Sequence, residues 1–201
     1  MTTAEIISSA MAGLSLIVSV LTAYLTLLSR FKGTMLAKRR VVLTQVESTP
    51  CLVLECEFVN DGSKPGSIDD ILVKMRDLET GSQFVLIPFL VRDQFNIFQS
   101  YQMSDFSAFS GISLGAKQRR EMFVIFKPMQ AKFEPPNGKV VLHTSICANA
   151  DSKKYTESPT LISLNLDQDT IERWARPDGS PQLIQAVEIS QSRREYLEHQ
   201  R

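Results

Sequence analysis

The sequence predicts a mainly β protein in which a single N-terminal transmembrane helix is followed by an antiparallel β-sandwich with short C-terminal helices. Three observations lead to this prediction. No charged residue occurs in the 24 positions between Glu5 and Arg30, apolar residues alternate with polar ones from Val41 onward, and turn-forming residues separate the alternating runs. A long uncharged run is typical of a membrane span, and a period of two is typical of strands with one buried face.

The uncharged run, from about Ile6 to Ser29, is long enough to cross a bilayer. At ~1.5 Å per helical residue it reaches roughly 36 Å, against about 30 Å of hydrocarbon. Eleven of its residues are Leu, Ile or Val. We therefore expect an uncleaved anchor that contacts the lipid bilayer through residues 6–29. A cleaved signal peptide and a helix lying on the membrane surface are the alternatives, although no Lys or Arg precedes Ile6.

Basic residues flank only the C-terminal side of this run. Lys and Arg next to a span are retained in the cytoplasm, so the protein is predicted to be single-pass with a cytoplasmic C-terminal domain. The same side chains are candidates for contact with lipid headgroups. They are Arg30, Lys32, Lys38, Arg39 and Arg40.

The rest of the chain is acidic. Residues 41–201 hold 17 basic and 21 acidic side chains, although the whole chain is formally neutral. A domain that binds nucleic acid needs a basic face for the phosphates. Nucleic acid is therefore not an expected partner.

Small hydroxyl side chains follow one face of the expected span. Ser15, Ser19, Thr22 and Thr26 are three or four residues apart, as neighbours on a helix face are. Such a face lets a second helix approach closely, so one hypothesis is helix–helix contact in a homo-oligomer or with a partner helix. The alternative is that each hydroxyl donates to a carbonyl four residues earlier in its own helix.

The pattern divides the chain into a transmembrane anchor at 1–32, a basic juxtamembrane linker at 33–40, a β-sandwich domain at 41–167 and a C-terminal helical extension at 168–201. Eight short strands without a helix between them predict two packed sheets. The strands are expected near 41–47, 51–59, 70–76, 83–89, 111–115, 120–127, 138–147 and 160–166.

Alternation within the strands predicts which side chains are buried. Leu52, Leu54, Cys56 and Phe58 share one face of their strand and are expected in the core. The strand at 120–127 is apolar on both faces. It should therefore be covered on both sides and lie centrally in its sheet.

Residues 58–68, FVNDGSKPGSI, place a strand, an Asn/Gly turn and a proline-led return one after another. This stretch resembles immunoglobulin-like sandwiches of envelope and adhesion proteins. The resemblance implies an immunoglobulin-like architecture for the β domain. It covers about a dozen residues and implies no function.

Two helices are expected after the last strand. Asp169, followed by Ile171 and Trp174, predicts a short capped helix that ends before Pro177. Ser180 and Pro181 then resemble the cap and first position of a second helix, with its apolar residues at helical spacing.

Groups able to do chemistry are few and scattered. His143 and Cys147 share one strand face, but about 13 Å separates residues four apart on a strand, too far for a nucleophile and its base. Asp69 and Asp70 stand at a strand entry, where acids commonly form turns. The chain contains no phosphate-binding, dinucleotide-binding, serine-hydrolase or zinc-protease motif. We therefore expect no catalytic residue, no cofactor, no metal and no enzyme activity.

The three cysteines, Cys51, Cys56 and Cys147, do not form a disulfide framework, because their number is odd and their spacing does not repeat. Cys51 and Cys56 are five residues apart, so they point to opposite faces of one strand. Buried, reduced thiols are expected.

The longest segment without strand character runs from 91 to 111 and is rich in aromatic residues. Long loops in compact domains are often functional, and exposed rings make effective contacts, so this segment is a candidate partner surface. The alternative is that the rings fold back and close one end of the domain. The rings are Phe95, Phe98, Tyr101, Phe106 and Phe109.

An anchor joined to a domain without catalytic motifs favours a membrane-tethered, non-enzymatic protein-interaction or scaffold domain with an unknown protein partner. One alternative is an extracytoplasmic ligand-binding or assembly module, which requires the charge rule to fail here. A hydrolase built from isolated Asp and Ser residues with His143 is the other.

Overall fold

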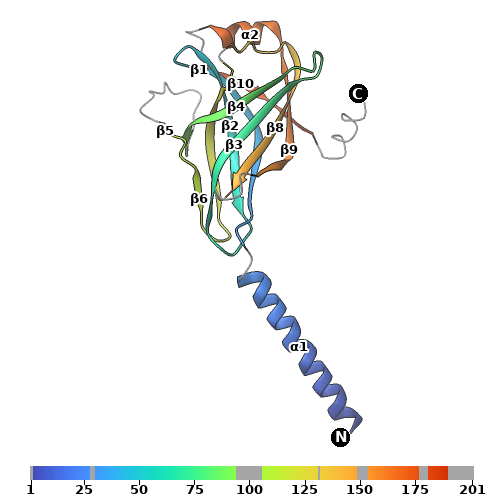
Figure 1. The fold of residues 1–201 in the computed structure, drawn as a ribbon. Coiled ribbons are helices and arrows are strands. Elements are labelled where there is room, and N and C mark those ends of the chain that lie inside the picture. Colours follow the sequence, from blue (N-terminus) through green and yellow to red (C-terminus); the bar gives the residue numbers. More distant parts are fainter. Residues whose placement is uncertain are drawn as a thin grey trace.

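The computed structural model describes residues 2–27, 30–93, 106–130, 132–148, 154–176 and 181–189. One long helix, α1 (Thr3–Leu27), is followed by a mainly antiparallel β domain and one short helix, α2 (Gln168–Ala175). Figure 1 shows α1 projecting from one end of the β domain while α2 lies at the opposite end. We name these the helix-proximal and helix-distal ends.

All eight predicted strands are present. The strands are β1 (Gly33–Val46), β2 (Thr49–Asn60), β3 (Gly66–Asp77), β4 (Gln83–Arg92), β5 (Ser107–Ala108), β6 (Ile112–Leu114), β7 (Arg119–Pro128), β8 (Gly138–Ala148), β9 (Tyr155–Leu166), β10 (Gln182–Gln185) and β11 (Val187–Ile189). They form one antiparallel sheet in the order β10-β1-β2-β7-β4-β3-β8-β9-β11, with β5 beside β4 and β6 beside β3.

This single sheet curls until it is nearly closed, whereas the sequence predicted two packed sheets. The closure is made by the C-terminal segment 182–189, because β10 pairs with β1 and β11 pairs with β9. Between them, the Ala186 N–H donates to the Arg39 carbonyl at 2.9 Å. Near the starts of β1 and β9, the Ser158 hydroxyl donates to the Met35 carbonyl at 2.6 Å. Alternation reveals which side chains face inward but not how sheet edges meet, so the sequence could not show this closure.

Residues 33–40, expected to be a linker, form the first half of β1. Gly33 pairs with Asn60 and the register continues to Ala37 opposite Cys56, after which a bulge precedes Val41. The sequence did not indicate this part of the strand, because basic side chains dominate it and only two of its residues, Met35 and Ala37, are buried. The β domain therefore begins three residues after Arg30.

The first predicted C-terminal helix is confirmed as α2, although its cap is Asp167 and not Asp169. The Asp167 carboxylate accepts the Thr170 N–H at 2.8 Å, and hydrogen bonding with the side chain and then the backbone of Thr170 lowers the pKa of this carboxyl. The second predicted helix, from Ser180, is wrong. Residues 182–185 and 187–189 are strands, because the edges of β1 and β9 offer unpaired backbone groups that an isolated short helix cannot match.

The predicted core faces are confirmed. Leu52, Leu54, Cys56 and Phe58 are fully buried inside the curled sheet. β7 lies between β2 and β4 and is covered on both faces, since Met122, Val124 and Phe126 face the interior while Phe123 and Ile125 join a smaller apolar cluster outside.

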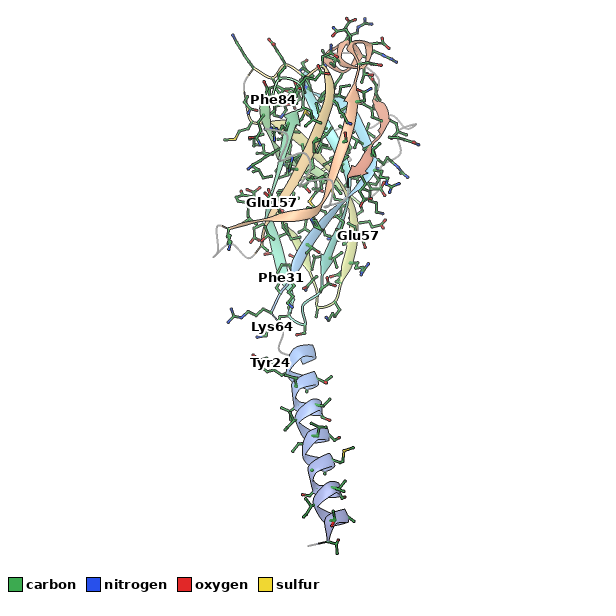
Figure 2. The ribbon with its side chains drawn as sticks, turned by 90° about the vertical axis from the view of Figure 1, so that its right-hand side faces the viewer. Tyr24, Phe31, Glu57, Lys64, Phe84 and Glu157 are labelled. Atoms are coloured by element: carbon green, nitrogen blue, oxygen red, sulfur yellow. The ribbon has the colours of Figure 1, made fainter. Side chains whose placement is uncertain are left out.

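Aromatic side chains close both ends of the interior. At the helix-distal end the Trp174 ring lies edge-on to Phe133 at 5.7 Å between centroids and packs on the core. At the helix-proximal end Phe31 covers Gly66, where any Cβ would overlap its ring. Figure 2 shows Phe31 at the end of the domain next to α1. The apolar interior cluster is thus covered by rings at both ends.

Asp77 organises the turn between β3 and β4. Its carboxylate accepts the Thr80 hydroxyl at 2.6 Å and the Glu79 N–H at 2.8 Å. These bonds, that to Thr80 foremost, lower the pKa of Asp77 because they favour the charged form.

A carboxyl whose pKa is lower in the folded state stabilises the fold above its unfolded pKa of about 3.9 and loses this effect as pH falls through the folded pKa. We therefore expect Asp77→Asn to lower the free energy of unfolding by about 1 kcal/mol near neutral pH. The difference from the unsubstituted protein should begin to shrink as pH falls below about 4 and should disappear below the lower folded pKa of Asp77, where this carboxyl is uncharged. Urea unfolding over a pH series measures this. A difference that does not change with pH would contradict the assigned role of the charge.

Candidate functional site

The long helix α1 is apolar and uncovered. Its segment Ile6–Tyr24 has a mean hydropathy of 2.0, is long enough to cross a membrane, and makes no buried contact with the β domain. Side chains such as Leu14, Leu16 and Ile17 are more than half exposed. Apolar surface of this extent is unfavourable in water and is matched by a hydrocarbon environment.

The hydroxyl groups of α1 bond within the helix. Ser19 donates to the Ser15 carbonyl at 2.8 Å and Thr22 donates to the Val18 carbonyl at 2.7 Å. This geometry agrees with the alternative of self-satisfied hydroxyls. The structure describes no second helix against this face and does not describe the side chain of Thr26. Helix–helix contact therefore stays a prediction.

The five basic residues expected at the lipid surface divide into two groups. Arg30 and Lys32 lie at the helix-proximal end, directly before β1. Lys38, Arg39 and Arg40 instead lie along β1 and form ion pairs with acidic residues. Their position on the sheet follows from the pairing of residues 33–40 with β2.

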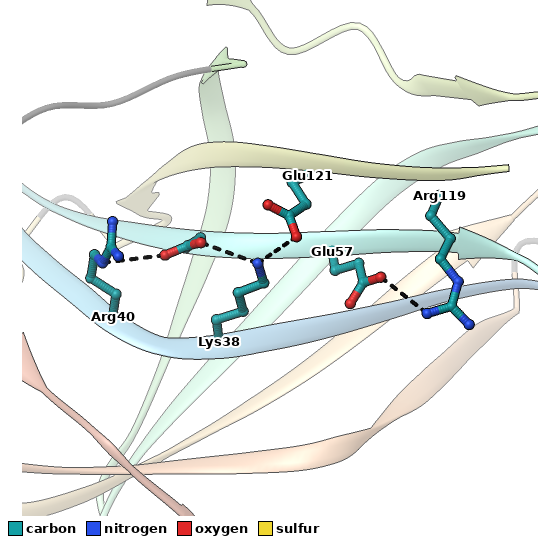
Figure 3. Close-up of polar contacts among 6 residues, drawn as sticks. Lys38, Arg40, Glu57, Arg119 and Glu121 are labelled. Atoms are coloured by element: carbon teal, nitrogen blue, oxygen red, sulfur yellow. Dashed lines mark hydrogen bonds and ion pairs between the residues drawn. The ribbon is translucent and has the colours of Figure 1, made fainter.

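A row of ion pairs crosses the outer face of β1, β2 and β7, as Figure 3 shows. Lys38 Nζ lies 2.6 Å from Glu121 and 3.2 Å from Glu55, and Arg40 Nε lies 3.4 Å from the other oxygen of Glu55. The bonds to Glu121 and Glu55 raise the pKa of Lys38. These cations are already neutralised by neighbouring strands, so they support the sheet.

The burial of Glu55 makes it the central member of this row. Its side chain is 12% exposed, whereas that of Glu121 is 62% exposed. Exposed pairs contribute little because water and salt screen them. We expect Glu55→Gln to lower the free energy of unfolding by about 1 kcal/mol and Glu121→Gln by less than about 0.5 kcal/mol. Denaturant unfolding of both variants measures the difference, and equal effects would contradict it.

Two rings of the aromatic segment pack onto the β domain. Phe106 is half-buried against the outer apolar cluster, with the Arg92 guanidinium 5.5 Å from its ring centre. Phe109 packs against the interior cluster, and its N–H donates to the Phe89 carbonyl at 3.0 Å. These positions agree with the alternative in which rings fold back onto the domain. Phe95, Phe98 and Tyr101 lie outside the described residues.

The cysteines are free thiols and all three are buried. Burial raises the pKa of Cys51 to about 11 and raises that of Cys56 as well, so both remain protonated at neutral pH. Asp70 accepts the Tyr155 hydroxyl, which together with burial raises the pKa of Tyr155 to about 12. Among the described residues no three His, Cys, Asp or Glu side chains are grouped so that they could hold a metal ion.

Asn60 is the organising residue of the helix-proximal end, and it is fully buried. Its side-chain oxygen accepts the N–H groups of Lys32 at 3.2 Å and Gly62 at 2.9 Å. Its amide nitrogen donates to the carbonyls of Lys64 at 2.8 Å and Gly115 at 2.7 Å. One side chain thus joins the start of β1, the β2–β3 turn and the β6–β7 turn.

Backbone contacts complete this junction. The Asp61 N–H donates to the Lys32 carbonyl at 3.1 Å, and the Lys117 N–H donates to the Gly62 carbonyl at 3.1 Å. Gly62 lies so close to Arg30 that any Cβ there would overlap the Arg30 carbonyl oxygen. Three segments distant in sequence are thereby held side by side.

Four exposed basic residues are gathered by this junction, and we call them the basic rim: Arg30, Lys32, Lys64 and Lys117. The sequence indicates the first two, which follow the apolar run, but not Lys64 and Lys117, because each stands alone in its turn. The marked turn at 60–63 was the only available signal. Chemically, ammonium and guanidinium groups on a rigid frame can bind anions. Comparisons with family models and with curated proteins find no match to this chain.

Proposed function

We propose that this protein is a membrane-tethered, non-enzymatic protein-interaction or scaffold domain held at the cytoplasmic face of a bilayer. The observation that carries the proposal is the uncovered apolar helix, which is joined to the β domain by only five residues, 28–32. So short a connection restricts the domain to the membrane surface. An immunoglobulin-like relationship of the sheet is part of the same proposal and rests on residues 58–68.

Charge supports the cytoplasmic orientation. The basic residues Arg30 and Lys32 follow the span within five residues, and Lys64 and Lys117 lie beside them through the Asn60 junction. Positive charge close to a span favours retention on the cytoplasmic side. Three free, buried thiols agree with a reducing compartment.

The interior and the outer charges support a binding role without catalysis. The inside of the sheet is packed with apolar side chains, and the ion-pair row uses its charges for neighbouring strands. The C-terminal segment exposes Leu183 and Val187, with 44% and 62% of their surfaces accessible. We propose this segment as the surface that contacts a protein partner.

The anchor and its orientation are tested on the full chain in cells. We expect the full chain to stay in the membrane fraction after extraction with alkaline carbonate and to be released by detergent. A C-terminal reporter that works in one compartment only should be active in the cytosol. Release by carbonate would contradict the anchor. Reporter activity outside the cytosol would contradict the orientation and would favour an extracytoplasmic ligand-binding or assembly module.

The partner surface is tested by substitution. We expect Leu183→Glu with Val187→Glu to abolish recovery of a partner that co-purifies with the unsubstituted full chain. The matched control, Lys132→Glu with Lys139→Glu, alters two exposed lysines elsewhere on the domain and should leave recovery unchanged. Equal recovery with both double variants would contradict this surface.

A further inference from the structure

We propose that the basic rim, Arg30, Lys32, Lys64 and Lys117, binds the headgroups of anionic phospholipids in the membrane that α1 spans. The inference rests on the proposed anchoring of α1. It goes beyond it because it assigns the β domain its own lipid-binding surface, built from two turns that are remote from α1 in sequence.

Chain connectivity places the rim at headgroup depth. Arg30 is three residues after Leu27, the last residue of α1, so their Cα atoms are at most about 11 Å apart. The headgroup region on each side of a bilayer is roughly 5–8 Å thick. Tyr24, near the end of the span, is exposed and has the amphipathic character that favours the interface. Figure 2 shows Lys64 at the end of the domain that faces α1 and Tyr24.

The rim is also a concentration of positive charge with few nearby acids. Asp61 is the single acidic residue among residues 30–36, 60–66 and 115–118, which build this end. Within the described parts of the chain, no ion pair is found for the side chains of Arg30, Lys32 or Lys64. The Lys117 ammonium donates to the Asp61 main-chain carbonyl, an uncharged group. Lys38 and Arg40 differ, because Glu55 and Glu121 neutralise them.

The frame beneath these charges is rigid. The four hydrogen bonds of Asn60 and the tight contact of Gly62 with Arg30 fix the three segments relative to one another. Because the turns are already fixed relative to one another, binding does not have to order the backbone, which favours several simultaneous weak contacts. A layer of anionic headgroups offers many such contacts at once.

Position and net charge together favour a lipid surface over other anions. The remainder of the domain is acidic, so a long polyanion would meet repulsion beyond the rim. A bilayer surface touches only this end. Each Lys or Arg near an anionic surface strengthens binding to that surface roughly fivefold, and this effect weakens as the salt concentration rises.

The test uses the full chain in lipid nanodiscs made either of phosphatidylcholine alone or with about 30% phosphatidylserine. Amide hydrogen exchange is followed in peptides that cover residues 60–66 and 115–119. We expect exchange there to slow by roughly fivefold or more in the anionic discs, and the difference to disappear as salt rises from about 0.05 to 0.5 M. Lys64→Glu with Lys117→Glu should abolish the protection, whereas the control Lys132→Glu with Lys139→Glu should retain it.

Each other outcome overturns the inference. Equal exchange in both discs, or protection that survives Lys64→Glu with Lys117→Glu, would show that the rim does not bind anionic headgroups. Protection by soluble glycerophosphoserine in neutral discs would indicate a site for single small anions instead of a surface. A chain that enters neither disc would refute the anchor as well as the rim. Failure of the anchor can therefore be distinguished from failure of the rim alone.

Discussion

Trp174→Ala is expected to lower the free energy of unfolding by about 3–5 kcal/mol, because it removes the largest buried side chain of the β domain. Trp174 is 2% exposed and closes the helix-distal end of the core beside Phe133. Its indole N–H donates to the Thr44 carbonyl at 3.0 Å and to the Cys51 carbonyl at 3.1 Å, so it also joins the ends of β1 and β2. Chemical denaturation of the full chain in detergent, followed by circular dichroism, measures the loss.

Trp174→Phe separates packing from hydrogen bonding. Phenylalanine keeps much of the buried ring area but leaves two carbonyls without their donor, so we expect a loss of about 1–3 kcal/mol. A loss after Trp174→Ala no larger than that after Trp174→Phe would show that the ring does not close the core. A change of less than about 0.5 kcal/mol in both variants would contradict burial of this residue altogether.

Asn60→Ala is expected to be the second most damaging single change, with a loss of about 2–4 kcal/mol. Alanine fills the position but leaves the N–H groups of Lys32 and Gly62 and the carbonyls of Lys64 and Gly115 without their partner. Buried polar groups that lose a partner cost about 1–3 kcal/mol each, and some will find water at this end. The single tryptophan reports unfolding of this variant by fluorescence.

Asn137→Ala is the matched control, since Asn137 is exposed and its amide makes one bond, to Gln168 at 3.3 Å. Its effect should stay within about 0.5 kcal/mol. Because Asn60 fixes the basic rim, Asn60→Ala should also speed amide exchange of residues 60–66 more than that of β8. Uniform acceleration across the domain would mean that Asn60 supports the sheet as a whole and not this end in particular.

Local pattern predicted most of the sheet but little of its assembly. The inward face of β2 follows from alternation, because burial of one face requires it, and the cover on both sides of β7 follows from its apolar residues on both faces. The pairing of 182–189 depends instead on two strand edges far away in sequence, and the segment itself has helix-like spacing. The strand at 33–40 was not predicted for a related reason. Its basic side chains form ion pairs with Glu55, Glu121 and Glu188, which are distant in sequence and come near only on folding.

The candidate site shows the same division. Arg30 and Lys32 could be recognised because they follow the apolar run directly. Lys64 and Lys117 could not, because a lone lysine in a turn has no pattern. The hydrogen bonds of Asn60 and the backbone bond from Lys117 to Gly62 bring their turns together only in the folded protein. The sequence therefore shows which basic residues follow the apolar run, but it does not show that the turns holding Lys64 and Lys117 lie beside them.

The segment that closes the sheet also contains the last of the described strands to be synthesised. Until residues 182–189 have left the ribosome, the edges of β1 and β9 have no backbone partners there, although β1 follows directly after the apolar helix α1. Unpaired strand edges readily join other chains. During translation the growing protein therefore passes through a stage in which its earliest strand is open to mispairing.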